Sequence, residues 1–86
     1  MINTITIADT KEIRADRTVD SLIIENKKTK KSKSFCLYND QGIYFKLFSD
    51  YEDFDKFVNK GDESIDFLEF FSDEELDYYL EKLELN

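Results

Sequence analysis

The C-terminal third of the chain, residues 50–86, combines many carboxylates with apolar side chains at helical spacing. It carries 14 Asp and Glu residues against three Lys residues. Its last apolar residues, Leu76, Tyr79, Leu80 and Leu83, recur at i, i+3, i+4 and i+7, which predicts an amphipathic helix. Such an apolar stripe must be buried against another element, so we expect a folded helical cover rather than an acidic tail.

Two S-x-x-E sequences predict where the helices of this third begin. Ser49 with Glu52 and Ser72 with Glu75 each match a capping box, in which a Ser hydroxyl accepts a hydrogen bond from the third helical backbone N–H. The first predicts a helix over about 50–60, and Gly61 follows where a left-handed residue commonly ends a helix. Residues 62–71 are too apolar to be exposed, and we expect a short helix or helical turn there that begins near Ser64.

The first 49 residues are rich in strand patterns. β-Branched and alternating apolar residues predict four strands, at Asn3–Ala8, Ser21–Asn26, Ser34–Tyr38 and Ile43–Phe48. The Asn39 to Gly42 segment predicts a tight hairpin turn with Gly42 at positive φ. Residues 9–19 stay open between a connecting loop and a helical turn, because Ile13 is their only large apolar residue before Val19.

This order of elements defines the expected fold class. We predict an α+β fold in which an antiparallel sheet of three to four strands, a meander, is covered on one face by two to three C-terminal helices. Residues 1–86 should form a single domain with a strand-rich part at 1–49 and an acidic helical part at 50–86. The eight Phe and five Tyr residues should supply most of its core.

The composition limits the cellular setting and the chemistry. No apolar run is long enough to span a membrane, the N-terminus lacks the features of a signal peptide, and the lone Cys36 allows no intrachain disulfide. We therefore expect a soluble intracellular protein, with Cys36 as a small buried hydrophobe. The chain has no His, no phosphate-binding Gly loop and no nucleophile elbow, so we predict neither enzyme activity nor a cofactor. Its acids lack the spacing of a calcium-binding loop, and no metal site is expected.

The run from Lys27 to Lys33 contains five Lys residues between two predicted strands. It indicates a hairpin with a solvated tip, and it also fits contact with nucleic acid or with an anionic patch on a protein. We favour no direct nucleic-acid contact, because residues 50–86 carry a formal charge of −11 on the same small body and would repel phosphate.

The acidic helices allow two interpretations. The carboxylates either keep the protein soluble or imitate the phosphate backbone that nucleic-acid-binding proteins contact with Lys and Arg. In the second case Tyr78 adds an aromatic anchor. The candidate partner-binding residues are Asp50, Glu52, Asp53, Asp55, Asp73, Glu74, Asp77, Tyr78, Glu81 and Glu84.

From residue 34 onward the layout of the chain resembles a known group of inhibitors. A strand, an N-D-x-G turn, a second strand, a helix and the acidic, aromatic segment DEELDYYLEKLELN follow in order. This layout is similar to that of small acidic inhibitors of phages and mobile elements, most of all the type II-A anti-CRISPR proteins that mimic DNA. The resemblance implies that the partner is a CRISPR nuclease or another DNA-handling enzyme of a bacterial host, blocked in the host cytoplasm.

The sequence therefore leads to one main hypothesis and two alternatives. The main hypothesis is a non-enzymatic inhibitor whose acidic helical surface blocks the basic nucleic-acid-binding groove of a nuclease or similar protein. The first alternative is an immunity protein or antitoxin that neutralises a basic nuclease toxin. The second is a small adaptor subunit that binds through exposed aromatic residues while its acids keep it soluble.

Overall fold

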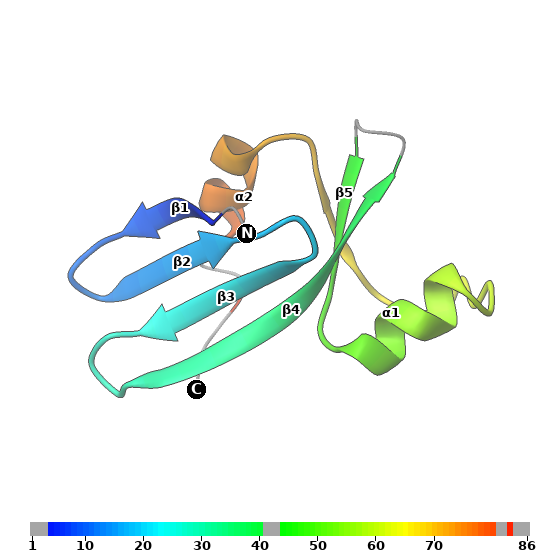
Figure 1. Ribbon diagram of the computed structural model, residues 1–86, viewed down its shortest axis with the longest axis horizontal. Coiled ribbons are helices and arrows are strands. Elements are labelled where there is room, and N and C mark those ends of the chain that lie inside the picture. The colour runs from blue at the N-terminus through cyan, green and yellow to red at the C-terminus, as the bar shows by residue number, and fades with distance from the viewer. Residues whose placement is uncertain (1–3, 41–43, 81–82, 84–86) are drawn as a thin grey trace.

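A single antiparallel sheet organises the computed structural model, which describes residues 4–40, 44–80 and 83 (Figure 1). Its six strands follow one another in chain order across the sheet. The elements of the described part are β1 (Ile5–Asp9), β2 (Ile13–Arg17), β3 (Ser21–Asn26), β4 (Lys31–Asp40), β5 (Tyr44–Phe48), α1 (Tyr51–Val58), β6 (Leu68–Phe70) and α2 (Asp73–Tyr79). The predicted α+β meander is confirmed, but the predicted three to four strands are too few.

One additional strand is β2, within the segment 9–19 that was expected to be a loop or a helical turn. It pairs with β1 and β3, and Ala15 lies opposite Ile24. Ala15 is fully buried although it is small. The strand forms because its two neighbours satisfy its backbone N–H and C=O groups, so it needs little apolar surface of its own.

The other additional strand is β6, and the helix expected within 62–71 is wrong. Residues 63 and 64 form a turn, and Leu68 and Phe70 then pair with Leu47 and Phe45 of β5. Leu68 and Phe70 share one side of the sheet because side chains alternate along a strand. Phe70 is completely buried, whereas Glu69 between the two apolar residues is exposed. This alternation is the pattern of a strand and not of a helix.

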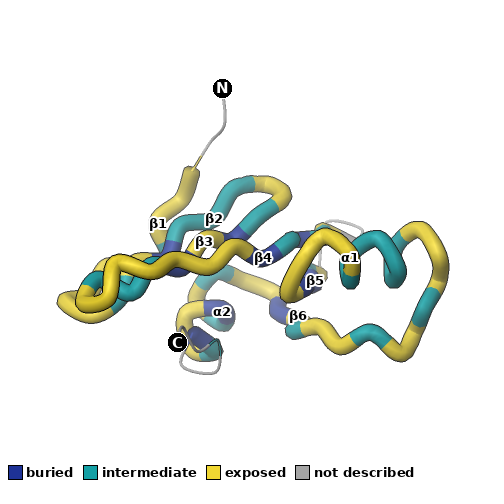
Figure 2. The backbone as a smooth tube through the Cα atoms, turned by 90° about the horizontal axis from the view of Figure 1, so that it is seen from below, coloured by how far each residue is buried: buried dark blue, intermediate teal, exposed yellow. Residues whose placement is uncertain are grey.

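The two helices pack against opposite faces of the sheet, which corrects the expected single covered face. Consecutive residues of β5 point to opposite sides. Leu47 belongs to the main core with Leu76 and Leu80 of the α2 segment. Phe48 instead contacts aromatic rings of the α1 side, as described below. Figure 2 shows α2 below β3 and β4, with α1 on the other side of β5 and β6.

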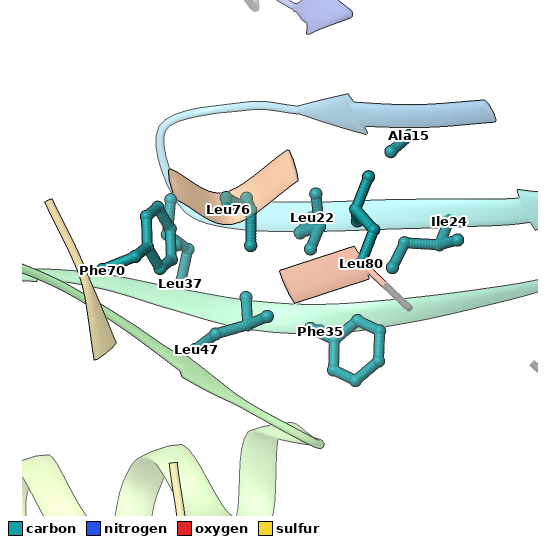
Figure 3. Close-up of a cluster of buried hydrophobic side chains, with 9 residues drawn as sticks. All are labelled: Ala15, Leu22, Ile24, Phe35, Leu37, Leu47, Phe70, Leu76 and Leu80. Atoms are coloured by element: carbon teal, nitrogen blue, oxygen red, sulfur yellow. The ribbon is translucent and has the colours of Figure 1, made fainter. Parts of the chain in front are cut away.

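The main core lies between the sheet and α2. Figure 3 shows Leu76 and Leu80 among buried side chains that come from β2, β3, β4, β5 and β6. The buried cluster consists of Ala15, Leu22, Ile24, Phe35, Leu37, Leu47, Phe70, Leu76 and Leu80.

A smaller aromatic core lies under α1. Phe48 is fully buried, and its ring centroid lies 5.8 Å from that of Phe54, 5.4 Å from that of Phe57 and 5.6 Å from that of Phe67. The aromatic residues therefore close the second face of the sheet, where α1 supplies the cover. None of the helices in the described part of the chain is long and apolar enough to cross a membrane.

The start of α1 differs from its prediction by one residue. Asp50, not Ser49, is the N-cap, and its carboxylate accepts a 2.8 Å hydrogen bond from the backbone N–H of Asp53. Asp and Ser cap helices about equally well, so adjacent candidates cannot be separated by residue type. The expected left-handed conformation of Gly61 is confirmed by its φ of +68°, but the helix itself ends at Val58, two residues earlier than expected.

The hairpins agree with the sequence where the structure describes them. Lys27 to Lys30 form the predicted turn between β3 and β4, although β4 begins earlier and ends later than expected. β1 covers most of the predicted first strand. The expected turn at Gly42 and the start of the next strand at Ile43 lie outside the described residues, as does Asn3.

Candidate functional site

Helix α2 carries four of the ten predicted partner-binding residues, and its start is fixed by two hydrogen bonds. The backbone N–H of Glu75 donates to the Ser72 hydroxyl over 3.2 Å, which confirms Ser72 as the N-cap. The Glu75 carboxylate accepts a 2.8 Å bond from the N–H of Phe71, one residue before the cap. Both side chains of the predicted capping box therefore stabilise the first turn.

Asp73 is committed to a contact within the protein. Its carboxylate receives two hydrogen bonds from the Arg17 guanidinium, at 2.6 Å from Nε and 3.2 Å from Nη2. The same guanidinium lies 5.3 Å from the centre of the Phe45 ring. Asp73 thus holds α2 to β2, and its charge is already balanced. Sequence reasoning missed Arg17, because only the pairing of β2 brings it to α2.

Three neighbouring residues of α2 remain available to a partner. Glu74, Asp77 and Tyr78 are exposed, Tyr78 at 77%. Neither carboxylate forms an ion pair within the described residues. Their i, i+3 and i+4 spacing places them on one side of the helix. We call these three residues the α2 acidic face. Glu81 and Glu84, which were expected to extend it, lie outside the part of the chain that the structure describes.

The predicted acids of α1 are largely engaged by their own helix. Glu52 forms an ion pair with Lys56 at 3.1 Å, and this hydrogen bond and charge raise the pKa of the lysine. Asp55 lies 3.6 Å from the Lys60 ammonium and accepts a 2.7 Å hydrogen bond from the Asn59 side chain.

Asp50 caps the same helix. Asp50 and Asp53 are the two members of the α1 group without a direct ion pair among the described residues. Because α1 and α2 cover opposite faces of the sheet, the structure does not join their acids into one continuous surface.

Tyr44 of β5 and Phe71, which lies just before α2, form an exposed aromatic pair. The rings of Tyr44 and Phe71 are 5.0 Å apart, with 37% and 55% of each residue exposed. The buried lysine Lys46 lies between Tyr44 and Phe67, at 5.8 Å and 5.7 Å from their ring centres, and pairs with Glu69 at 3.3 Å. Sequence patterns identified the strand of Tyr44 but not its contact with Phe71, which requires β6.

The remaining chemistry of the described residues is sparse. A depression of about 230 Å³ is lined mainly by apolar side chains, among them Phe35, Leu47 and Phe67. This volume is below the roughly 300 to 1,000 Å³ of most ligand pockets. No group of three or more His, Cys, Asp or Glu residues within the described ranges is arranged to hold a metal ion.

Cys36 is half-buried on β4, and burial followed by the charges of Asp50 and Asp20 raises its thiol pKa above the usual 9.0. These causes disfavour the thiolate, so the thiol is a poor nucleophile near neutral pH.

Comparison with protein-family models, with curated proteins and with solved structures finds no match for this chain.

Proposed function

We propose that the protein is a non-enzymatic inhibitor that uses the α2 acidic face to bind the basic nucleic-acid-binding groove of another protein. The observation that carries this proposal is a pair of carboxylates, Glu74 and Asp77, that form no ion pair within the described residues. They lie next to the exposed ring of Tyr78 on a helix that is fixed at its start. Carboxylates without internal partners keep their full charge for a partner's Lys and Arg residues.

Rigidity is what distinguishes this surface from a solvated acidic tail. Leu76 is fully buried, and Arg17 holds Asp73 at the start of the helix. The chain therefore loses little conformational freedom when the α2 acidic face is bound, which favours affinity. Glu74 and Asp77 are three residues apart and thus separated by about 4.5 Å along the helix axis, so both can face the Lys and Arg side chains of one phosphate-binding groove.

The resemblance in layout to type II-A anti-CRISPR proteins suggests a CRISPR effector nuclease as the target. A DNA-mimicking surface blocks such an enzyme by occupying its DNA-binding channel without being cleaved. The proposal is centred on α2. The acids of α1 are left out because they lie on the opposite face, and because Glu52 and Asp55 already pair with Lys56 and Lys60.

A competition experiment tests this proposal. Binding of DNA by a type II-A effector nuclease loaded with its guide RNA is measured with increasing amounts of the protein. The test variant combines Glu74→Gln, Asp77→Asn and Tyr78→Ala, and we expect at least about a tenfold loss of inhibition, or about 1.4 kcal/mol. The matched control combines Glu52→Gln, Asp55→Asn and Tyr51→Ala on α1, where inhibition should persist.

Salt dependence provides a second readout of the same experiment. Charge-based recognition weakens as ionic strength rises. Inhibition that stays constant across a salt series, or that is lost equally in the α1 control, contradicts the proposal.

A second candidate, an adaptor subunit, is favoured by the exposed Tyr44 and Phe71 rings. Aromatic residues are enriched in protein interfaces. In that case Tyr44→Ala with Phe71→Ala abolishes partner binding, whereas the triple variant of the α2 acidic face retains it.

A further inference from the structure

The turn between β3 and β4 presents a cluster of lysines that the proposed function does not use. We call Lys28, Lys30, Lys31 and Lys33 the lysine tip. Lys27, beside them, is neutralised, because its ammonium forms an ion pair with Asp9 and lowers the pKa of that carboxyl. Lys28 lies 3.9 Å from Glu12 with both side chains about three-quarters exposed, so this contact is weak.

The other three lysines of the tip have no acidic partner within the described residues. Lys33 lies 5.0 Å from the centre of the Phe35 ring, a contact that holds its ammonium in place without reducing its charge. Lys30 and Lys31 are exposed to solvent. The tip therefore carries about four positive charges that nothing in the described structure balances fully.

The backbone of this turn is well fixed. The Asn26 side-chain oxygen accepts hydrogen bonds from the N–H groups of Lys28 and Thr29, at 3.0 and 3.2 Å. The N–H of Lys30 donates to the Asn26 carbonyl over 2.8 Å, and that of Lys31 to the Thr29 hydroxyl over 3.3 Å. The lysines thus project from a rigid support rather than from a flexible loop.

Lys30 has a left-handed backbone conformation that Gly or Asn adopts more easily. Its φ is 62°, in the left-handed region where Gly and Asn are preferred and a residue such as Lys is strained. Outliers of this kind are found where a side chain is needed in place for binding.

The lysine tip also lies far from the acidic residues of α1. The longest axis of the molecule is 39 Å, and Figure 1 places the β3–β4 turn at one end and α1 at the other. The Debye length at physiological salt is about 8 Å, so the acids of α1 are screened from the tip. This arrangement reduces the electrostatic objection that the net charge of −8 raises against phosphate binding.

We propose that the lysine tip binds the phosphate backbone of a nucleic acid without reading its sequence. The composition of the tip decides between this partner and a protein. Protein interfaces are depleted in Lys and enriched in aromatic residues, whereas Lys is a standard ligand of backbone phosphates. The residues that form the tip include four lysines, Thr29 and Ser32, and no aromatic side chain. The proposal does not rest on the proposed function, because it uses a different surface.

The test measures binding of labelled duplex DNA and duplex RNA of equal length to the intact protein over a salt series. With four phosphate contacts the logarithm of the affinity should fall with the logarithm of salt with a slope of about −3.6, or about 100-fold between 50 and 200 mM. The variant Lys28→Gln, Lys30→Gln, Lys31→Gln should reduce this fall to about threefold. Similar binding of both duplexes indicates backbone contact, and preference for one shows which groove shape the tip fits.

Lys30→Gly separates charge from structure. It removes one charge while relieving the left-handed strain, so the variant should melt at a higher temperature and still bind more weakly. Lys60→Gln, at the α1 end, is the matched control and should bind as the parent does. The variant Glu74→Gln, Asp77→Asn should not weaken the binding of nucleic acid.

Four outcomes overturn the proposal. The first is an absence of binding to both duplexes at about 50 mM salt, and the second is an affinity that does not depend on salt. The third is a loss of nucleic-acid affinity in Lys60→Gln as large as that in the triple lysine variant. The fourth is that the parent protein self-associates without binding nucleic acid, and that the triple lysine variant no longer self-associates. The last would identify a second copy of the chain as the occupant of the tip.

Discussion

Arg17 and Asp73 lie 56 residues apart in the chain and form a two-pronged ion pair that joins β2 to the first turn of α2. The pair links β2, whose segment the sequence left open between a loop and a helical turn, to α2, which the sequence predicted from its capping box and apolar stripe. The Arg17 side chain is 15% exposed and that of Asp73 is 35% exposed, so the contact is partly shielded from water.

Breaking this pair should destabilise the fold. Arg17→Ala and Asp73→Asn each remove hydrogen bonds between charged groups and leave the other partner unsatisfied, which should cost about 1 to 2 kcal/mol of unfolding free energy. Urea denaturation measures the loss. Glu74→Gln is the control, because this exposed neighbour has no ion pair within the described residues, and its effect should stay within about 0.5 kcal/mol. Single variants that behave like Glu74→Gln would show that the pair adds no stability.

The N-cap of α1 gives a test between two adjacent residues. Asp50→Ala removes the carboxylate that accepts the Asp53 N–H and should cost about 1 kcal/mol. Ser49→Ala removes only an exposed hydroxyl, so its unfolding free energy should match that of the parent. A larger effect at Ser49 than at Asp50 would restore the sequence-based capping box.

The sequence predicts the elements of this fold that depend on residues close together in the chain better than those that depend on pairing with a distant strand. Ser72, Gly61 and the Leu76 to Leu83 stripe act within a few residues of chain, and the described part confirms the cap, the left-handed glycine and the buried Leu76 and Leu80. β2 and β6 exist because neighbouring strands satisfy their backbone groups. Their own residues carry little strand signal, since Ala15 is small and Phe70 lies in an evenly apolar segment.

The same distinction applies to the candidate site. Helical spacing placed Glu74, Asp77 and Tyr78 on one exposed side of α2. It gave no indication that Asp73 faces Arg17, which required the register of β2 beside β3. Nor did spacing show that α1 and α2 lie on opposite faces. Leu47 and Phe48 point to opposite sides of β5, but the sequence alone does not tell which helix each side chain contacts.

The aromatic core under α1 should be as important as the larger core under α2. Phe48→Ala removes a fully buried ring that contacts Phe54, Phe57 and Phe67, and the resulting cavity should cost about 3 to 5 kcal/mol. For a domain of this size that is a large part of its stability. Tyr51→Ala, at a 67% exposed position on the same helix, is the control and should cost much less. Thermal unfolding followed by circular dichroism compares the two.

Cys36 should titrate above its usual range. Burial and two nearby carboxylates disfavour the thiolate, so the folded pKa lies above the unfolded value of 9.0. As the pH rises past 9.0 the unfolded chain loses its proton first, and the stability of the fold therefore declines with further increase in pH. The rate of iodoacetamide alkylation against pH should show a midpoint above 9.0 for the folded protein and near 9.0 in concentrated urea. Equal midpoints would contradict the effect of burial.

Gly61 tests the cost of a left-handed residue without any steric complication. Its φ is +68°, and a Cβ added there would meet nothing within 4 Å. Gly61→Ala should therefore lower the unfolding free energy by about 1 kcal/mol through backbone strain alone. Gly61→Asn should lose less, because Asn tolerates this conformation better. Unfolding in urea ranks the three proteins, and equal stability of the Ala variant would mean that residue 61 can leave the left-handed region freely. Lys30→Gly makes the opposite change at a φ of 62° and should raise stability by a similar amount.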